Sequence, residues 1–529
     1  MRKLFILGID GASFDMLEPW IAAGDLPGLG ELVGNGCRAI LQSSIPPLSP
    51  VAWTSIATGV NPGKHGVYDF LMKKQGGDNN RPLFTFARGS DRKTKAFWEI
   101  LSDHGKSSIV VNMPCSFPPD PINGLMISGW DSARDRAKGF YPDELYTEII
   151  EKFGAYYMGP FDLLSKSEMV HTNPDSNRKL HEAMLVITQL RRKALLHLAR
   201  EHPWDTFFGV FTESDVVQHR FWNTISSKDH TQSPIFQVYQ EIDLFIQNLL
   251  KDFGKDIDIM VVSDHGFTSL STGLDLNLYL EQHGFLKRRV SAAGFLLFFL
   301  LKRMKTMRRR LKSLLSKSWV PERLGAAKPR HMDIDFPNTR IFFEGTYPFF
   351  YAAQPVRGED TLTGLREALT SLQYQGERVF KDVLPANEAF WGPYVDEIPE
   401  FVGILNEHFE AAGADAFMNQ GARNREVFCN HVWDGNHTEN GIFIFRGEDV
   451  RERQLERLKV FDIAPTVLGY YGVAVPKEMD GKPIEAILGS REIKYSDYNI
   501  YKDESLVSSS LGQDDASAIE DRLKSLGYL

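Results

Sequence analysis

Residues 4–11 read LFILGIDG, and this stretch decides the expected fold. Its apolar residues follow one another without alternation, which is typical of a strand that is buried on both faces of a parallel sheet. The run stops at Asp10, and Gly11 then allows a tight turn. We therefore expect a first central strand over Leu4–Ile9 with an aspartate at its carboxyl end.

Further runs of the same kind recur along the chain, each short and mostly apolar and each stopping at a polar or glycine residue. These runs are Ser108–Val111, Thr206–Phe211, Ile259–Val262 and Gly441–Phe445. Segments of helical character lie between several of them, such as Lys179–His202 and Ser233–Phe253. Strands that alternate with helices predict an α/β fold, with a mostly parallel central sheet flanked by helices on both faces.

The pattern changes after Leu274, where a basic amphipathic stretch and a region rich in Gly, Pro and aromatic residues follow, and strand signals return near His437. The expected units are a core formed by residues 1–274 and 421–489, an inserted cap or substrate region at 275–420, and a polar tail at 490–529 that ends in a short helix over 518–529.

Composition excludes some classes of protein. A length of 529 residues suits two or three structural units, at about 100–200 residues each. The net charge of −9 argues against nucleic acid as a partner. The 3 cysteines are far apart and odd in number, so they indicate neither a disulfide framework nor a CxxC metal site. A reducing compartment, the cytoplasm, fits best, and the oligomeric state stays open.

No apolar run reaches the roughly 18 residues of a membrane-spanning helix. The nearest, Ala292–Leu301, is followed by a basic run that ends at Lys312. Segment 292–312 is therefore a candidate interfacial helix for peripheral contact with an anionic membrane. The alternative is a solvated basic helix on the inserted region.

Polar residues with metal-binding chemistry follow the expected strands, where ligands bind in open α/β sheets. Asp10 ends the first strand. Asp215 and His219 follow Thr206–Phe211 and are four residues apart, so they share one face of a helix. Asp264 and His265 follow Ile259–Val262, and His437 precedes the last strand. Imidazole and carboxylate together suit Zn²⁺, and Mn²⁺ is tolerated by the same ligands.

Ser49 and Pro50 form a helix start, with serine expected as N-cap and proline as the first helical residue. A hydroxyl at this position lies in a positive potential that favours its alkoxide and an incoming phosphate. A plain N-cap is the alternative. Thr54 is a rival hydroxyl, but inside the helix it lacks that field.

These motifs together resemble the alkaline phosphatase superfamily, in particular its type I phosphodiesterase/nucleotide pyrophosphatase group. The resemblance covers about residues 1–270 and 425–485. It is carried by the motifs above, by the stretch from Ser49 to Gly66, and by the later runs Lys459–Leu468 and Met479–Gly481.

The resemblance implies a phosphoric ester hydrolase that acts on a small phosphorylated substrate with two divalent metal ions, zinc or manganese. Ser49 would attack phosphorus to give a phosphoseryl intermediate, which water then hydrolyses. The implied ligands are Asp10, Ser49, Asp264 and His265 for one ion, and Asp215, His219 and His437 for the other.

One departure from the group's pattern concerns the phosphoryl oxygens. Relatives often carry an asparagine shortly after the His-Gly pair that is His65-Gly66 here, but this chain continues with Val67–Phe70. Another donor must serve, and the candidates are the backbone N–H groups of the helix start, Lys64 and Asn112. Residues 64–66 are also interpreted as a structural turn.

Three other functions use the same fold, since fold alone does not decide the chemistry. A sulfatase would carry an arginine four residues after its nucleophile, where this chain has Trp53. A phosphomutase would use the same serine and metals. A non-catalytic, membrane-associated binding relative would have lost some of the seven expected ligands. Whether monoesters or diesters are cleaved stays open.

Overall fold

The computed structural model describes residues 2–74, 83–132, 135–170, 172–225, 229–288, 334–353, 359–411, 426–429, 433–448, 450 and 453–503. The expected membrane-contact segment at 292–312 and the expected helix at 518–529 lie outside these residues. Among the helices of the described part, none has the length and apolarity that a bilayer crossing requires.

A nine-stranded central sheet has the strand order β22-β2-β21-β9-β1-β8-β5-β6-β7. Its strands are β1 (Lys3–Ile9), β2 (Cys37–Gln42), β5 (Ser108–Met113), β6 (Gly124–Ser128), β7 (Phe140–Tyr141), β8 (Thr206–Phe211), β9 (Ile257–Val262), β21 (Asn440–Arg446) and β22 (Leu458–Lys459). Only β21 and β7 run antiparallel to their neighbours within this sheet. The mostly parallel α/β fold expected from the sequence is confirmed.

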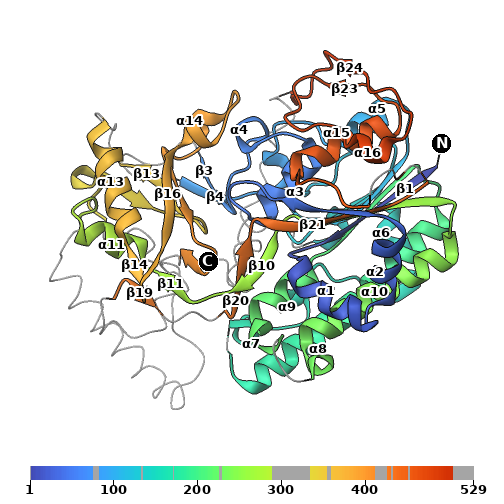
Figure 1. Ribbon diagram of the computed structural model, residues 1–529, viewed down its shortest axis with the longest axis horizontal. Helices are drawn as coiled ribbons and strands as arrows, with labels where there is room; N and C mark the ends of the chain where they lie inside the picture. The colour runs from blue at the N-terminus through green and yellow to red at the C-terminus, as the bar shows by residue number, and fades with distance from the viewer. Residues whose placement is uncertain are drawn as a thin grey trace, which may run out of the picture.

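Helices cover both faces of this sheet (Figure 1). One face carries α1 (Phe14–Ala23), α2 (Pro27–Asn35), α8 (Pro174–Glu201) and α10 (Pro234–Phe253), and the other carries α3 (Ser49–Thr58), α5 (Phe97–Asp103) and α15 (Ile463–Tyr470). Successive side chains of β1 point to opposite faces. Phe5 and Leu7 therefore join one apolar core, while Leu4 and Ile6 join the other. This double burial explains the unbroken apolar run.

Residues within the expected insertion form a second layer beside the core, drawn from yellow-green to orange in Figure 1. It contains α11 (Leu276–Gln282), α13 (Glu359–Ser371) and a sheet with the order β12-β13-β17-β16. The strands are β12 (Ile341–Phe343), β13 (Phe349–Ala352), β16 (Phe380–Pro385) and β17 (Phe401–Leu405), all antiparallel. A separate apolar cluster, which includes Leu280, Phe350 and Val402, holds this layer together.

The described chain contains further α-helices and strands. They are α4 (Pro62–His65), β3 (Leu71–Lys74), β4 (Leu83–Phe86), α6 (Glu144–Phe153), α7 (Lys166–Val170), α9 (Glu213–Phe221), β10 (Gly266–Ser269), β11 (Thr272–Leu274), β14 (Gln373–Tyr374), β15 (Glu377–Arg378), α14 (Ala386–Ala389), β18 (Phe409–Ala411), β19 (Phe428–Cys429), β20 (Gly435–Thr438), β23 (Val475–Pro476), α16 (Glu485–Leu488) and β24 (Tyr495–Ser496). Strand β11 lies between β18 and β19, and so joins the inserted layer to the core.

Candidate active site

The parallel strands β1, β8 and β9 lie side by side and end at one edge of the central sheet. Residues that follow these strands therefore emerge next to one another. They are Asp10 after β1, Asp215 in α9 after β8, and Asp264 and His265 directly after β9. All four side chains are buried. Four groups that are far apart in the sequence thus meet at one place.

Ser49 lies at the start of α3, and its hydroxyl reaches this place. Its Oγ is 3.4 Å from Asp10 Oδ1 and 3.3 Å from His265 Nε2. The expected N-cap position is wrong by one residue, because the N-cap is Leu48 and Ser49 is already helical. The Leu48 carbonyl accepts from the N–H groups of Val51 and Ala52. The Ser49 hydroxyl is therefore not used as a cap and points into the cluster.

A second group forms beside the first. Asp215 and His219 share one face of α9, as their spacing predicts, with Asp215 Oδ1 3.4 Å from His219 Nε2. His437 lies on β20, which pairs with β10 in a register that places His437 opposite Phe267. His437 Nε2 is 3.1 Å from Asp215 Oδ1 and 2.9 Å from His219 Nε2. The seven residues expected from the sequence are therefore all in one cluster.

The three imidazoles are oriented in the same way, because each Nδ1 contacts a backbone carbonyl. The carbonyls are those of Gly435 for His219 at 3.0 Å, Gly266 for His265 at 3.1 Å and Pro47 for His437 at 2.8 Å. A carbonyl can only accept, so each Nδ1 carries the proton. In its neutral form, each imidazole then directs the lone pair of Nε2 into the cluster, the arrangement that metal-binding histidines adopt.

Among the residues that the structure describes, two sets of ligand atoms lie close enough together to hold a metal ion. Asp215, His219 and His437 form one set and Asp10, Asp215 and His265 the other, with all atoms of a set within 4.8 Å of one another. Asp215 belongs to both sets, although the sequence resemblance assigned it to one ion. His265 belongs to one set and His437 to the other, and their rings stack on each other with centroids 3.6 Å apart. This buried set of nitrogen and oxygen donors fits divalent cations such as zinc.

Electrostatics also favour a cation at this position. Burial raises the pKa of Asp10 well above its usual value, and the charges of Asp264 and Asp215 raise it further. Burial likewise raises the pKa of Asp264 to about 7. The pKa of the His265 imidazole is lowered by burial and by His437. Asp215 and His437 differ from these groups: burial opposes their charged forms, but the charge of His219 and the contact between Asp215 and His437 hold the pKa of Asp215 below its usual value and that of His437 above it. A bound cation would stabilise Asp10 and Asp264 as carboxylates.

Several residues considered from the sequence are engaged elsewhere. Thr54 Oγ1 donates to the carbonyl of Pro50 at 2.6 Å. Lys64 Nζ donates to Asp480 Oδ1 at 2.8 Å. Residues 64–66 form a turn, since Gly66 ends α4 with a φ of 80° and its N–H donates to the carbonyl of Pro62. Asn112 donates its amide hydrogens to Val210 O and Thr212 Oγ1. At the start of α3, Pro50 has no N–H, and the N–H groups of Val51 and Ala52 donate to the Leu48 carbonyl. Only the N–H of Ser49 is then left in this turn to bind a phosphoryl oxygen.

Three contacts of the site were not predicted. Trp53 Nε1 donates to Asp10 Oδ2 at 3.0 Å. Ser214 Oγ donates to the carbonyl of Asp10 at 2.7 Å, and Gln218 Nε2 donates to that of Gly11 at 3.1 Å. From the sequence, Trp53 was noted only because a sulfatase has an arginine at this position, and no contact with Asp10 was predicted. A hydrogen bond between strand end and helix has no local sequence signal.

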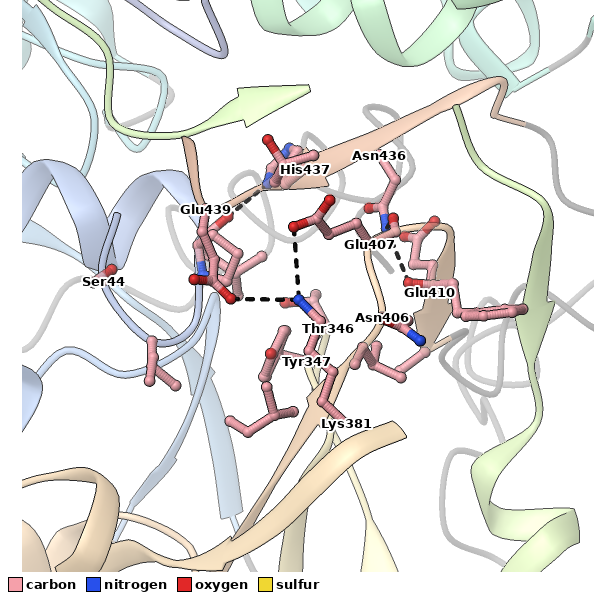
Figure 2. Close-up of a pocket in the computed structure, with 18 of the residues that line it drawn as sticks. Ser44, Thr346, Tyr347, Lys381, Asn406, Glu407, Glu410, Asn436, His437 and Glu439 are labelled. Atoms are coloured by element: carbon pink, nitrogen blue, oxygen red, sulfur yellow. Dashed lines mark hydrogen bonds and ion pairs between the residues drawn. The ribbon is translucent and has the colours of Figure 1, made fainter. Parts of the chain in front are cut away.

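A pocket opens between the cluster and the inserted layer (Figure 2). His219 and His437 line its inner side, and residues of β16, β17 and β18 line the other. Figure 2 shows the amino group of Lys381 between two carboxylates, with Nζ 3.6 Å from both Glu407 Oε1 and Glu439 Oε1. Any molecule that reaches the cluster through this pocket therefore contacts the inserted layer.

Asp69 holds one wall of this pocket in place. Thr346, which lines the pocket, donates its N–H to Asp69 Oδ2 at 3.2 Å and its hydroxyl to Asp69 Oδ1 at 2.5 Å. Burial raises the pKa of Asp69 to about 6, although these donors lower it. The carboxylate thus connects the segment after α4 to the inserted layer.

We expect Asp69→Ala to lower the free energy of unfolding by about 1–3 kcal/mol, since it leaves partly buried donors of Thr346 without their acceptor. Urea unfolding of the purified chain measures this. The matched control is Asp382→Ala, which removes a surface ion pair with Arg366 and should cost about 0–1 kcal/mol. Equal losses in the two variants would argue against this role of Asp69.

Comparison with known proteins gives a consistent result. Residues 4–410 match the family described as type I phosphodiesterase / nucleotide pyrophosphatase. This match contains six of the seven clustered residues, and His437 lies beyond its end. It also runs through most of the inserted region, which the sequence resemblance had left out. A search of curated protein sequences gave no significant match.

Two solved structures share the fold. Human ectonucleotide pyrophosphatase / phosphodiesterase 5 aligns with a TM-score of 0.50 and 12% identity, covering 92% of this chain and 98% of that protein. Phosphonoacetate hydrolase from Sinorhizobium meliloti 1021, in complex with phosphonoformate, aligns with a TM-score of 0.54 and 14% identity, covering 88% and 94%. At such low identity these likenesses establish a common architecture and no more.

Proposed function

The chain belongs to the family of type I phosphodiesterases and nucleotide pyrophosphatases, and from this premise we propose that it cleaves phosphate esters through Ser49 at a site for two divalent metal ions. Membership makes it a phosphoric ester hydrolase. One observation carries the finer proposal: three imidazoles, each held at Nδ1 by a backbone carbonyl, direct Nε2 at buried carboxylates beside the Ser49 hydroxyl.

We assign the ligands in two sets. Asp10, Ser49, Asp264 and His265 would hold one ion, and Asp215, His219 and His437 the other. The close set of Asp215, His219 and His437 supports the second assignment. The first is supported by the distances from His265 Nε2, which is 3.3 Å from Ser49 Oγ, 3.4 Å from Asp10 Oδ1 and 3.2 Å from Asp264 Oδ2. The imidazoles favour zinc, with manganese as the alternative. When bound, the ions would supply the positive charge that lowers the pKa of the serine hydroxyl and stabilises the transition state.

The reaction proposed for the chain's own residues has two steps. In the first, a bond forms between Ser49 Oγ and phosphorus while the bond from phosphorus to the leaving oxygen breaks. The hydroxyl already donates toward Asp10 Oδ1, so the proton passes along this contact and ends on the departing alcohol. In the second step, the oxygen of a water molecule forms a bond to phosphorus while the bond between phosphorus and Oγ breaks, and one proton of that water passes to Oγ, which restores the serine.

We further propose that the inserted region, residues 275–420, is the substrate cap of a core made of residues 1–274 and 421–489. The pocket supports this, because the cap side chains Lys381, Glu407 and Glu410 line it together with His219 and His437. The partner would be a small phosphorylated molecule. A cytoplasmic location and a membrane contact through 292–312 stay predictions from the sequence.

A panel of esters tests the proposed reaction. The zinc- or manganese-loaded chain is assayed with p-nitrophenyl phosphate, bis-p-nitrophenyl phosphate and p-nitrophenyl sulfate. We expect turnover of at least one phosphate ester and no measurable turnover of the sulfate, because Trp53 stands where a sulfatase has arginine. A preference for the sulfate ester would reject the proposal, and the two phosphates separate monoesterase from diesterase activity.

A further inference from the structure

Asp10 makes different contacts through its two carboxylate oxygens. Oδ1 faces the reacting group, at 3.4 Å from both Ser49 Oγ and His265 Nε2. Oδ2 accepts the indole N–H of Trp53 at 3.0 Å. A carboxylate can rotate about its last torsion, which is broad for aspartate. A donor fixed on one oxygen therefore decides which oxygen faces the cluster.

Trp53 itself is closely packed on several sides. Its side chain is fully buried, and its ring packs against Phe208 with centroids 5.9 Å apart. On the side of β1 the ring lies against Gly8, where an added Cβ would come within 2.6 Å of a ring carbon. The absence of a side chain at residue 8 thus leaves room for the indole below the carboxyl end of β1.

The same helix supplies the serine and the indole. Trp53 is four residues after Ser49 on α3, so both side chains lie on one face of the helix. A shift of α3 would move the nucleophile and the support of Asp10 together. In addition, an indole N–H is a neutral donor. It orients the carboxylate without bringing a positive charge that would repel a cation, as an arginine at this place would.

We propose that Trp53 is a positioning residue, which orients Asp10 so that Oδ1 faces Ser49 and the neighbouring cation site. This inference rests on the proposed metal site and deepens it. The role of Trp53 does not depend on Ser49 being the nucleophile, because the experiment below measures metal affinity and not turnover.

The variant Trp53→Phe tests the proposal, since it keeps an aromatic ring and removes the N–H. We expect the zinc dissociation constant of one of the two sites to rise by about 10–100-fold, the usual effect of losing a partner of a metal ligand. Competition with a chromogenic zinc chelator measures this constant in the absence of substrate. The second site should keep its affinity.

Trp98→Phe is the matched control. Trp98 is also fully buried, also packs against Phe208, and also donates its indole N–H to a carboxylate, that of Asp120 at 2.9 Å. Asp120 pairs with Arg92 and belongs to no candidate metal set. This variant should lose thermal stability and keep both zinc affinities. If the two variants change zinc affinity equally, the proposal is wrong.

A second replacement keeps the test valid if Trp53→Phe fails to fold. Benzothienylalanine at residue 53 preserves the shape of the bicyclic ring and replaces the N–H by sulfur. We expect it to retain the melting temperature of the natural chain while weakening one zinc site. Unchanged zinc affinity in this protein would overturn the proposal. The activity of Ser49→Ala tests the nucleophile, and the zinc affinity of the Trp53 variants tests the positioning role. The two proposals can therefore fail separately.

Discussion

Ser49→Ala is expected to lower kcat on bis-p-nitrophenyl phosphate by roughly 10³-fold or more, the scale of losing a catalytic nucleophile. The reason is that alanine has no oxygen to form the bond to phosphorus. The side chain is buried at the start of α3 and is small, so the fold should be retained. Metal content should also stay largely intact, because carboxylates and imidazoles provide the other ligands.

Thr54→Val is the control for this variant. Thr54 lies on the same helix and is fully buried, but its hydroxyl donates to the carbonyl of Pro50. We expect Thr54→Val to retain activity within a small factor. Circular dichroism and metal analysis of both variants exclude unfolding as a cause. Unchanged turnover in Ser49→Ala would reject Ser49 as the nucleophile.

Removal of metal is expected to abolish activity and to lower the melting temperature. Asp10, Asp215 and Asp264 are all buried near one another, and without a cation two of these carboxyl groups have raised pKa values because of burial and mutual repulsion. Adding zinc back at about 100 times its dissociation constant should stabilise the fold by about 2.7 kcal/mol for each site that is filled. Differential scanning calorimetry during the titration measures this effect.

His202→Ala provides the comparison for the metal experiment. Its imidazole contacts Glu148 near the surface at 2.9 Å, outside both candidate metal sets. This variant should show the same loss on chelation and the same recovery with zinc as the natural chain. Full activity after exhaustive chelation would contradict the two-metal account.

Sequence patterns predicted the parts of this fold that local physics determines. The apolar run at Thr206–Phe211 matches β8 in both ends, because a strand buried on two faces needs apolar residues throughout. Asp215 and His219 lie on one face of α9, as predicted, because residues four apart in a helix share a face. The start of α3 was wrong by one residue, because serine is a much better N-cap than leucine. In the structure the Leu48 carbonyl accepts the first helical hydrogen bonds, and the Ser49 hydroxyl points into the cluster instead of capping the helix.

Contacts between distant segments were not accessible in this way. His437 reaches the cluster because β20 pairs with β10 in a register that sets it opposite Phe267. The carbonyl of Pro47 that orients its ring is 390 residues away in the sequence. Neither the register nor this partner leaves a periodic or compositional trace. The same holds for the indole of Trp53 beside Asp10, which depends on how α3 packs on the sheet.

The stereochemical course at phosphorus tests the central claim most directly. A phosphorothioate diester of known configuration is hydrolysed by the metal-loaded chain in ¹⁸O-labelled water. Two successive displacements, first by Ser49 and then by water, predict net retention of configuration. Net inversion would show that water attacks the ester itself, and would contradict a covalent intermediate on Ser49.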